Sequence, residues 1–290
     1  MVEIGRLKLV NPVMAASGTF GCGEEYGKFF DINKLGAIVT KTITLKARAG
    51  NPPPRIVETA SGMLNSIGLE NKGVNDFLKE KAPFLKKLKT KVVVSIAGET
   101  ERELKELAER VSASGAADAI ELNLSCPNIK GRGIIAQDAR AVAALTKAAK
   151  RAAKLPLMAK LSPNVTDIRE IAKAAEGAGA DAVCLVNTFP AMAVDINQRR
   201  PILGNTTGGL SGPAIKPIAL KMVWDAHSAV KIPIVGIGGI MTAEDAIEFI
   251  LCGATAIQVG TANFVNPRIT LDIIAGIKRY FSTRLNNLIE

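Results

Sequence analysis

The sequence predicts an α/β protein, a parallel (β/α)8 barrel of the TIM type, formed by a single domain over residues 1–290. Three observations lead to this prediction. Eight short apolar runs alternate with helical patterns, no linker or low-complexity segment divides the chain, and a glycine-containing motif recurs where helices give way to strands. Eight βα units in one domain close into a barrel more naturally than they form an open sheet.

The eight candidate strands are short and apolar. Each is bounded by glycine, proline or polar residues and mostly lacks polar alternation, as expected of parallel strands that are buried on both faces. The strands are expected at residues 13–16, 37–41, 92–97, 119–125, 156–162, 182–188, 232–238 and 256–260.

Helix starts and ends can be identified between these strands. Residues 100–103 fit a capping box, and Thr166 and Thr242 are expected to begin two further helices, each followed by an apolar stripe at helical spacing. Glycines that follow a helix and precede a strand are expected to end the helix in a left-handed conformation. These glycines are Gly115, Gly179 and Gly253.

Two long insertions follow the second and sixth strands. They span residue 42 to about residue 69, and residues 189–211. Loops at the C-terminal ends of barrel strands commonly carry the substrate site of such proteins. We therefore expect the functional residues at this end of the barrel.

Composition and residue patterns exclude several classes of protein. No apolar run approaches the roughly 18 to 20 residues of a membrane span, and residues 1–9 lack the apolar core of a secretory signal. The cysteines form no C-x-x-C pair, which argues against zinc, iron–sulfur or disulfide sites in this chain and favours a reducing cytoplasm. The single histidine, His227, falls in a helix away from the expected active end and excludes a histidine triad or histidine metal site. The cysteines are Cys22, Cys126, Cys184 and Cys252.

The formal net charge of +10 permits three interpretations. Nucleic-acid binding is one, supported by the lysine-rich residues 79–91, but no nucleic-acid motif accompanies the charge. A solvated helix face and turn is the favoured interpretation. A field that attracts anionic substrates is compatible with it.

Glycine-rich loops point to a phosphate-bearing ligand. Residues 236–239 close the seventh strand and residues 260–261 close the eighth, where barrels commonly bind phosphate through backbone N–H groups. Residues 208–212 add a third such loop. The alternative is that these glycines serve tight turns only.

Three polar residues at strand ends are candidates for chemistry. Cys126 follows the fourth strand in a polar loop before a proline, where a modest shift of a thiol pKa from about 8.5 would yield a base near neutral pH. The alternative is an inert small apolar residue, which is how we interpret Cys22, Cys184 and Cys252. Lys41 and Lys160 end strands and could meet a carboxylate or an electron-rich ring, or extend to the rim.

Taken together, the motifs resemble the class 1 dihydroorotate dehydrogenases, and more closely the branch linked to NAD (class 1B). The resemblance covers nearly the whole chain in order. The segments that carry it are residues 11–12, 15–21, 41–44, 50–55, 63–69, 121–128, 187–188, 199–201, 208–213, 238–239 and 260–261.

The resemblance implies an FMN-binding barrel that oxidises dihydroorotate to orotate in de novo pyrimidine (UMP) biosynthesis. It implies that hydride passes from C6 to FMN N5 and that Cys126 takes the proton from C5, with Lys41 as a second catalytic residue. Substrate-binding residues would be Lys41, Asn65, Ser66, Ile67, Gly68, Leu69, Asn123, Asn128, Asn187 and Thr188. Cofactor-binding residues would be Ala16, Ser17, Gly18, Thr40, Lys41, Asn123, Lys160, Val186, Gly212, Gly238, Gly239, Gly260 and Thr261.

The same resemblance implies a partner. A homodimer of this chain would form the core of a heterotetramer with a subunit that carries FAD and a [2Fe–2S] cluster and passes electrons to NAD. No metal, membrane or nucleic acid is expected for this chain. The alternatives are a fumarate-dependent class 1A enzyme and the related dihydropyrimidine dehydrogenase activity.

A few positions depart from the family pattern. Ser95 stands where asparagine is frequent, and Cys22 stands where an aromatic residue is common. The chain also begins late relative to many members, so the N-terminal hairpin is expected to be short.

Overall fold

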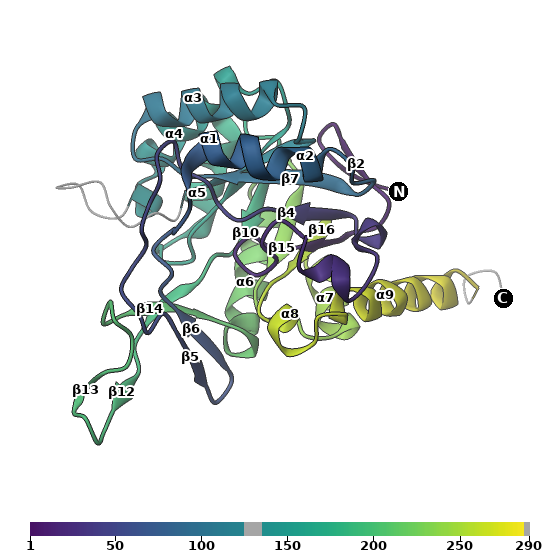
Figure 1. The fold of residues 1–290 in the computed structure, drawn as a ribbon. Coiled ribbons are helices and arrows are strands. Elements are labelled where there is room, and N and C mark those ends of the chain that lie inside the picture. Colours follow the sequence, from purple (N-terminus) through teal and green to yellow (C-terminus); the bar gives the residue numbers. More distant parts are fainter. Residues whose placement is uncertain (125–134, 287–290) are drawn as a thin grey trace.

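The computed structural model describes residues 1–124 and 135–286, and a closed barrel of eight parallel strands forms its centre (Figure 1). The strands follow one another round the barrel in sequence order, and β16 closes it by pairing with β3. The predicted (β/α)8 barrel is confirmed. Its strands are β3 (Val13–Ala15), β4 (Ala37–Val39), β7 (Lys91–Ile96), β8 (Ala119–Asn123), β9 (Leu157–Lys160), β10 (Ala182–Leu185), β15 (Ile234–Ile237) and β16 (Ala256–Val259).

Each predicted strand range overlaps one barrel strand, and each extends past its C-terminal end. Residues 40–41 and 186–188, for example, follow β4 and β10. These residues are still buried or half-buried, so their sequence pattern continues after the ladder of hydrogen bonds has ended. Of these residues, Lys41 and residues 186–188 line the candidate site.

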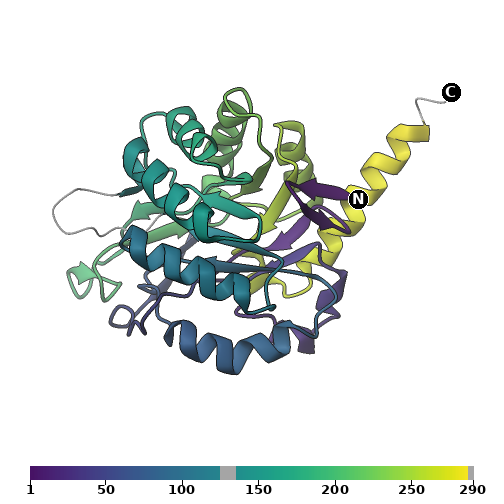
Figure 2. The same ribbon diagram turned by 90° about the horizontal axis from the view of Figure 1, so that it is seen from above.

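Helical segments surround the barrel, as Figure 2 shows from above. None of the helices in the described ranges has the length and apolar character that crossing a bilayer requires. The long helices are α3 (Glu101–Ala113), α4 (Ala139–Ala152), α5 (Ile168–Gly177), α6 (Lys216–His227), α7 (Ala243–Leu251) and α9 (Ile269–Asn286). The short ones are η1 (Tyr26–Lys28), η2 (Ile32–Lys34), α1 (Gly73–Asp76), η3 (Phe77–Lys81), α2 (Ala82–Leu85), η4 (Ile135–Gln137), η5 (Pro213–Ile215) and α8 (Ala262–Val265).

The helix ends agree with the sequence in most details. The capping box at residues 100–103 is half formed: the Thr100 hydroxyl accepts from the N–H group of Glu103, but the Glu103 carboxylate accepts from the N–H group one residue before Thr100. The start predicted at Thr166 was wrong by one residue, because the carboxylate of Asp167 caps α5. Thr242 caps α7 as predicted. The predicted helix-ending glycines all have positive φ: Gly115 (67°), Gly179 (93°) and Gly253 (104°).

A short hairpin closes the N-terminal end of the barrel. Its strands are β1 (Val2–Ile4) and β2 (Leu7–Leu9), so the hairpin expected to be short spans residues 2–9. Ile4 and Leu9 are at most 1% exposed and pack against inward-facing side chains of the barrel strands. The barrel interior at this end is therefore a dry apolar core.

Both predicted insertions are present, and they meet in one antiparallel sheet that we call the insertion sheet. It combines β5 (Ile56–Thr59) and β6 (Gly62–Asn65) of the first insertion with β11 (Phe189–Ala191) and β14 (Gly208–Ser211) of the second. A two-stranded hairpin of β12 (Val194–Asp195) and β13 (Arg200–Pro201) extends from it. Figure 1 shows these strands projecting from one end of the barrel. The sequence did not predict that the two insertions pair.

Candidate functional site

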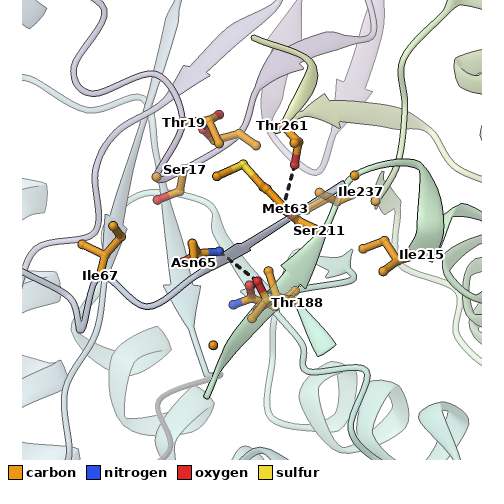
Figure 3. Close-up of a pocket in the computed structure, with 18 of the residues that line it drawn as sticks. Ser17, Thr19, Met63, Asn65, Ile67, Thr188, Ser211, Ile215, Ile237 and Thr261 are labelled. Atoms are coloured by element: carbon orange, nitrogen blue, oxygen red, sulfur yellow. Dashed lines mark hydrogen bonds between the residues drawn. The ribbon is translucent and has the colours of Figure 1, made fainter. Parts of the chain in front are cut away.

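A cavity of about 440 Å³ opens at the C-terminal ends of the barrel strands. Lys41, Asn123 and Gly260 line it from the barrel. Met63 and Asn65, labelled in Figure 3, line it from the insertion sheet. The Asn65 side chain donates to the carbonyl oxygen of Gly209 at 3.3 Å, which ties β6 to β14 beside the cavity. The volume lies within the roughly 300 to 1,000 Å³ of typical cofactor and ligand sites.

One part of the cavity is lined by glycines whose backbone leaves no room for side chains. Gly239 has a φ of 73°, and a Cβ there would lie 2.8 Å from the carbonyl oxygen of Gly212. Gly238 has a φ of 129°, and its Cβ would lie 2.9 Å from the nearest side-chain carbon. Thr261 adds a hydroxyl that bonds to Ser211 Oγ at 2.8 Å (Figure 3). We call Gly212, Gly238, Gly239, Gly260 and Thr261, which all line the cavity, the glycine cradle. Backbone N–H groups in such glycine loops suit an anion.

An ion-pair cluster joins the elements that follow the cradle. Lys216, at the start of α6, lies 2.5 Å from Asp245 and 2.9 Å from Glu248 of α7. The hydrogen bond to Asp245 is the main reason that the pKa of the Lys216 ammonium is raised, and the bond to Glu248 adds to this shift. Asp245 also accepts from the backbone N–H groups of Met241 and Thr242. The cluster therefore fixes α6 and α7 on either side of the cradle.

A chain of hydroxyl and amide groups runs along the strand ends. Ser17 Oγ lies 3.1 Å from Thr42 Oγ1, which lies 2.9 Å from Ser95 Oγ. Asn123 donates to Thr42 Oγ1 at 3.4 Å, and Asn187 donates to Asn123 Oδ1 at 3.4 Å. Ser95 is fully buried and does not line the cavity, whereas the two asparagines do. Each of these amides can bond a ligand with its remaining donors and acceptors.

The first insertion holds Lys41 beside a clamp of charged residues. Arg55 pairs with the carboxylate of Glu70, and its Nε donates to the carbonyl oxygen of Asn51 at 2.5 Å. Burial is the main reason that the pKa of the Lys41 ammonium lies below its ordinary value; Glu70 opposes this shift and Arg55 adds to it. Lys41 is therefore a partly desolvated cation that would gain from an anionic ligand.

Lys160 ends β9 at the cavity and faces a buried carboxylate. Its Nζ lies 3.6 Å from Oε1 of Glu121, and the two side chains are 7% and 0% exposed. Gln258 of β16 donates to the other carboxylate oxygen at 2.7 Å. Sequence reasoning had assigned no role to Glu121 or Gln258.

Most residues predicted for the site meet at this one cavity. Thr40 is an exception, because it is fully buried behind Ser17, whose hydroxyl donates to its carbonyl oxygen. The predictions for Cys126 and Asn128 lie outside the described residues. The predicted residues that line the cavity are Ala16, Ser17, Gly18, Lys41, Asn65, Ser66, Ile67, Gly68, Leu69, Asn123, Lys160, Val186, Asn187, Thr188, Gly212, Gly238, Gly239, Gly260 and Thr261.

The lining also contains residues that the sequence analysis did not select. Several are apolar or small and come from loops whose place could not be known before the fold. A polar signal was available at Asn164, which lies shortly after β9 as Asn187 lies shortly after β10. Lining residues that had not been selected include Thr19, Asn51, Met63, Asn164, Pro190, Thr207, Ser211, Ile215, Ile237, Met241 and Phe264.

The remaining cysteines agree with packing roles. Cys22 and Cys184 are buried, and burial raises the pKa of the Cys22 thiol to about 11. Cys252 is half-buried, and burial raises the pKa of its thiol as well. Within the part of the chain that the structure describes, no three His, Cys, Asp or Glu residues gather as a metal site would require.

Comparisons with known proteins agree on one family. A family model described as dihydroorotate dehydrogenase matches residues 1–281. Proteins named dihydroorotate dehydrogenase B (NAD(+)), catalytic subunit, are similar along nearly the whole chain: that of Desulforamulus reducens is 56% identical over 96% of this chain and 92% of its own length, and that of Trichlorobacter lovleyi is 55% identical over 98% and 93%. A crystal structure of DHODH from Eimeria tenella, in complex with ferulenol, shares the fold with a TM-score of 0.78 at 24% identity, covering 98% of this chain and 88% of that one.

Proposed function

The chain belongs to the dihydroorotate dehydrogenase family, on its NAD-linked branch, and from this premise we propose that it oxidises dihydroorotate to orotate in pyrimidine biosynthesis. The resemblance seen in the sequence is thereby confirmed. The observation that supports the proposed site is the meeting of a glycine cradle, Lys41 and several asparagines round one cavity. These groups suit a phosphate-bearing cofactor and a small polar anion.

The residues that line the cavity fit FMN. The cradle has no space for side chains at Gly238 and Gly239, as a backbone site for phosphate requires. Apolar groups such as Met63 and Ile237 suit a flat ring, and the amides of Asn123 and Asn187 suit its polar edge. We assign the cradle (Gly212, Gly238, Gly239, Gly260 and Thr261) to the phosphate and assign Ala16, Ser17, Gly18, Lys41, Asn123, Lys160 and Val186 to the rest of the cofactor. Thr40, which is fully buried, would act only by holding the Ser17 hydroxyl through its carbonyl oxygen.

Bound FMN would supply the acceptor for the hydride that leaves C6 of the substrate. Asn65, Asn123 and Asn187 would hold the amide and imide edges of the pyrimidine, with Ser66 to Leu69 and Thr188 beside them. The Lys41 ammonium would attract the substrate carboxylate, since it lacks full hydration in its half-buried position. We assign removal of the C5 proton to the thiolate of Cys126 and a substrate contact to Asn128, from their place in the sequence alone.

The electrons would leave through another protein. Relatives over 50% identical are named as catalytic subunits of NAD-dependent enzymes, and this chain has no strand–GxGxxG–helix unit for binding NAD. We propose a partner with FAD and a [2Fe–2S] cluster, docked on a homodimer of this chain to form a heterotetramer.

Purification of the chain alone tests these proposals. The protein should be yellow, or become so on reconstitution with FMN, and dihydroorotate should bleach it. A colourless protein that cannot take up FMN would refute the assignment of the cavity. Rapid turnover of NAD by the isolated chain would refute the partner, turnover of fumarate would place the chain with the fumarate-dependent enzymes, and turnover of dihydropyrimidines in place of dihydroorotate would change the substrate.

A further inference from the structure

A fully buried carboxylate lies beneath the cavity, and no step proposed above uses it. Glu121 occupies the middle of β8 and is 0% exposed. Its side chain points into the barrel, because it contacts Gln258 of β16 and Lys160 of β9. Oε2 accepts the hydrogen bond from Gln258, whereas Oε1 accepts none from any described residue.

The oxygen without a hydrogen bond faces Lys160. The 3.6 Å from Oε1 to Nζ is an ion-pair distance, but it is longer than a hydrogen bond. Lys160 also lines the cavity. Its ammonium is therefore positioned to interact with the carboxylate of Glu121 and with whatever occupies the cavity.

Because Glu121 and Lys160 are both buried, each charge is stabilised mainly by the other. A buried charge without a partner is strongly unfavourable, so removing either member leaves the other in an unstable state. The thiol of Cys184 lies 3.9 Å from the amide nitrogen of Gln258. Burial, and secondarily Glu121, raises the pKa of that thiol well above its ordinary value, so the thiol is neutral and adds no charge to the group.

We propose that Glu121 is a positioning residue that holds the Lys160 ammonium beneath the cavity and offsets part of its charge. The pair thereby sets how strongly the site prefers a reduced, more negative cofactor over the oxidised one. Gln258 orients the carboxylate for this purpose. The inference rests on the proposed function, since the cofactor in question is FMN.

A redox titration of the FMN-loaded protein, followed by its absorbance, tests the proposal. Glu121→Gln keeps the size of the side chain and removes its charge, so the Lys160 ammonium is no longer offset. We expect the preference for reduced over oxidised flavin to rise about tenfold, which is about 30 mV more positive for a two-electron couple. Glu121→Asp keeps the charge and should restore most of the wild-type potential.

A second background shows whether Glu121 acts through Lys160. In Lys160→Met the ammonium that Glu121 positions is absent, so adding Glu121→Gln should leave the potential of Lys160→Met nearly unchanged. This comparison involves no single Glu121 variant and holds even if Glu121→Gln does not fold. A difference between these two proteins would overturn the proposal.

Asp118→Asn is the matched control. Asp118 directly precedes β8, at the opposite end of the strand from the cavity, and pairs with Lys91 at 2.7 Å. The Asp118→Asn variant changes the net charge by the same amount as Glu121→Gln and should not change the potential of the bound flavin. A wild-type protein that does not bind FMN would refute the proposed function, and this inference with it. A wild-type protein that dihydroorotate bleaches, with an unchanged or lower potential in Glu121→Gln, would refute the inference alone.

Discussion

Gly239→Ala should weaken FMN binding by about 30- to 150-fold while the barrel remains folded. Gly239 has a φ of 73°, and a left-handed alanine costs roughly 1–2 kcal/mol. The added Cβ would lie 2.8 Å from the backbone oxygen of Gly212, and the local distortion that relieves this contact costs about 1 kcal/mol more. The ligand-free loop can relax, so we expect most of the resulting 2–3 kcal/mol to appear when the cradle closes on the phosphate, at about 1.4 kcal/mol per tenfold in Kd.

The assay is a titration of the apoprotein with FMN, followed by quenching of flavin fluorescence, with circular dichroism to verify the fold. Gly177→Ala serves as the control, because Gly177 ends α5 without positive φ and no atom beyond its own stretch of helix lies within 4 Å of its added Cβ. Its Kd should equal that of the wild type, and its Tm should be equal or slightly higher. A wild-type Kd for Gly239→Ala would show that the phosphate does not bind at the cradle.

Three further variants test other parts of the site. Cys126→Ser should still bind FMN and orotate but slow flavin reduction by dihydroorotate on the order of 10²-fold or more, as measured by stopped-flow absorbance; a wild-type rate would return Cys126 to a packing role. Lys160→Ala should lower the midpoint potential of bound FMN or weaken its binding, and an unchanged potential with full FMN content would contradict the role of its charge. Lys41→Met should raise the Tm of the ligand-free protein at pH 7. Because the folded pKa of Lys41 is lowered, the native state disfavours its proton until the pH passes the unfolded value of about 10.4, so the gain should fade as the pH approaches that value. A gain that is constant with pH would refute this explanation.

The barrel could be predicted because its signals are local. A short apolar run between turn residues predicts a buried strand. Each helix-ending glycine is required by the atoms that surround it. At Gly253, for instance, φ is 104° and a Cβ would lie 2.3 Å from the ring of His227. The cradle was predictable because its signal is also local. Adjacent glycines at the end of a barrel strand, here Gly238 and Gly239, indicate a backbone that approaches a ligand closely.

The features that the sequence analysis missed depend on contacts between distant segments. Asp167, rather than Thr166, caps α5, and two adjacent acceptors cannot be separated without the backbone geometry. Glu121 carried a signal, because a charged residue in an apolar strand is rarely buried without a partner. That partner, Lys160, lies on the next strand and becomes evident only from the register that pairs Asn123 with Lys160.

The insertion sheet has a consequence for how the protein folds. β6 and β14 pair through Asn65 with Gly209 and Leu64 with Leu210, so these contacts close a loop of well over a hundred residues. The chain entropy lost in such a closure must be offset by contacts already made, which favours local βα units forming before this long-range pairing. The insertion sheet should therefore be among the last parts of the protein to assemble, and its amide protons should be among the first to exchange with solvent. A ligand that contacts both the barrel and the insertion sheet would therefore stabilise the long-range pairing of β6 with β14, which forms least readily in the ligand-free protein.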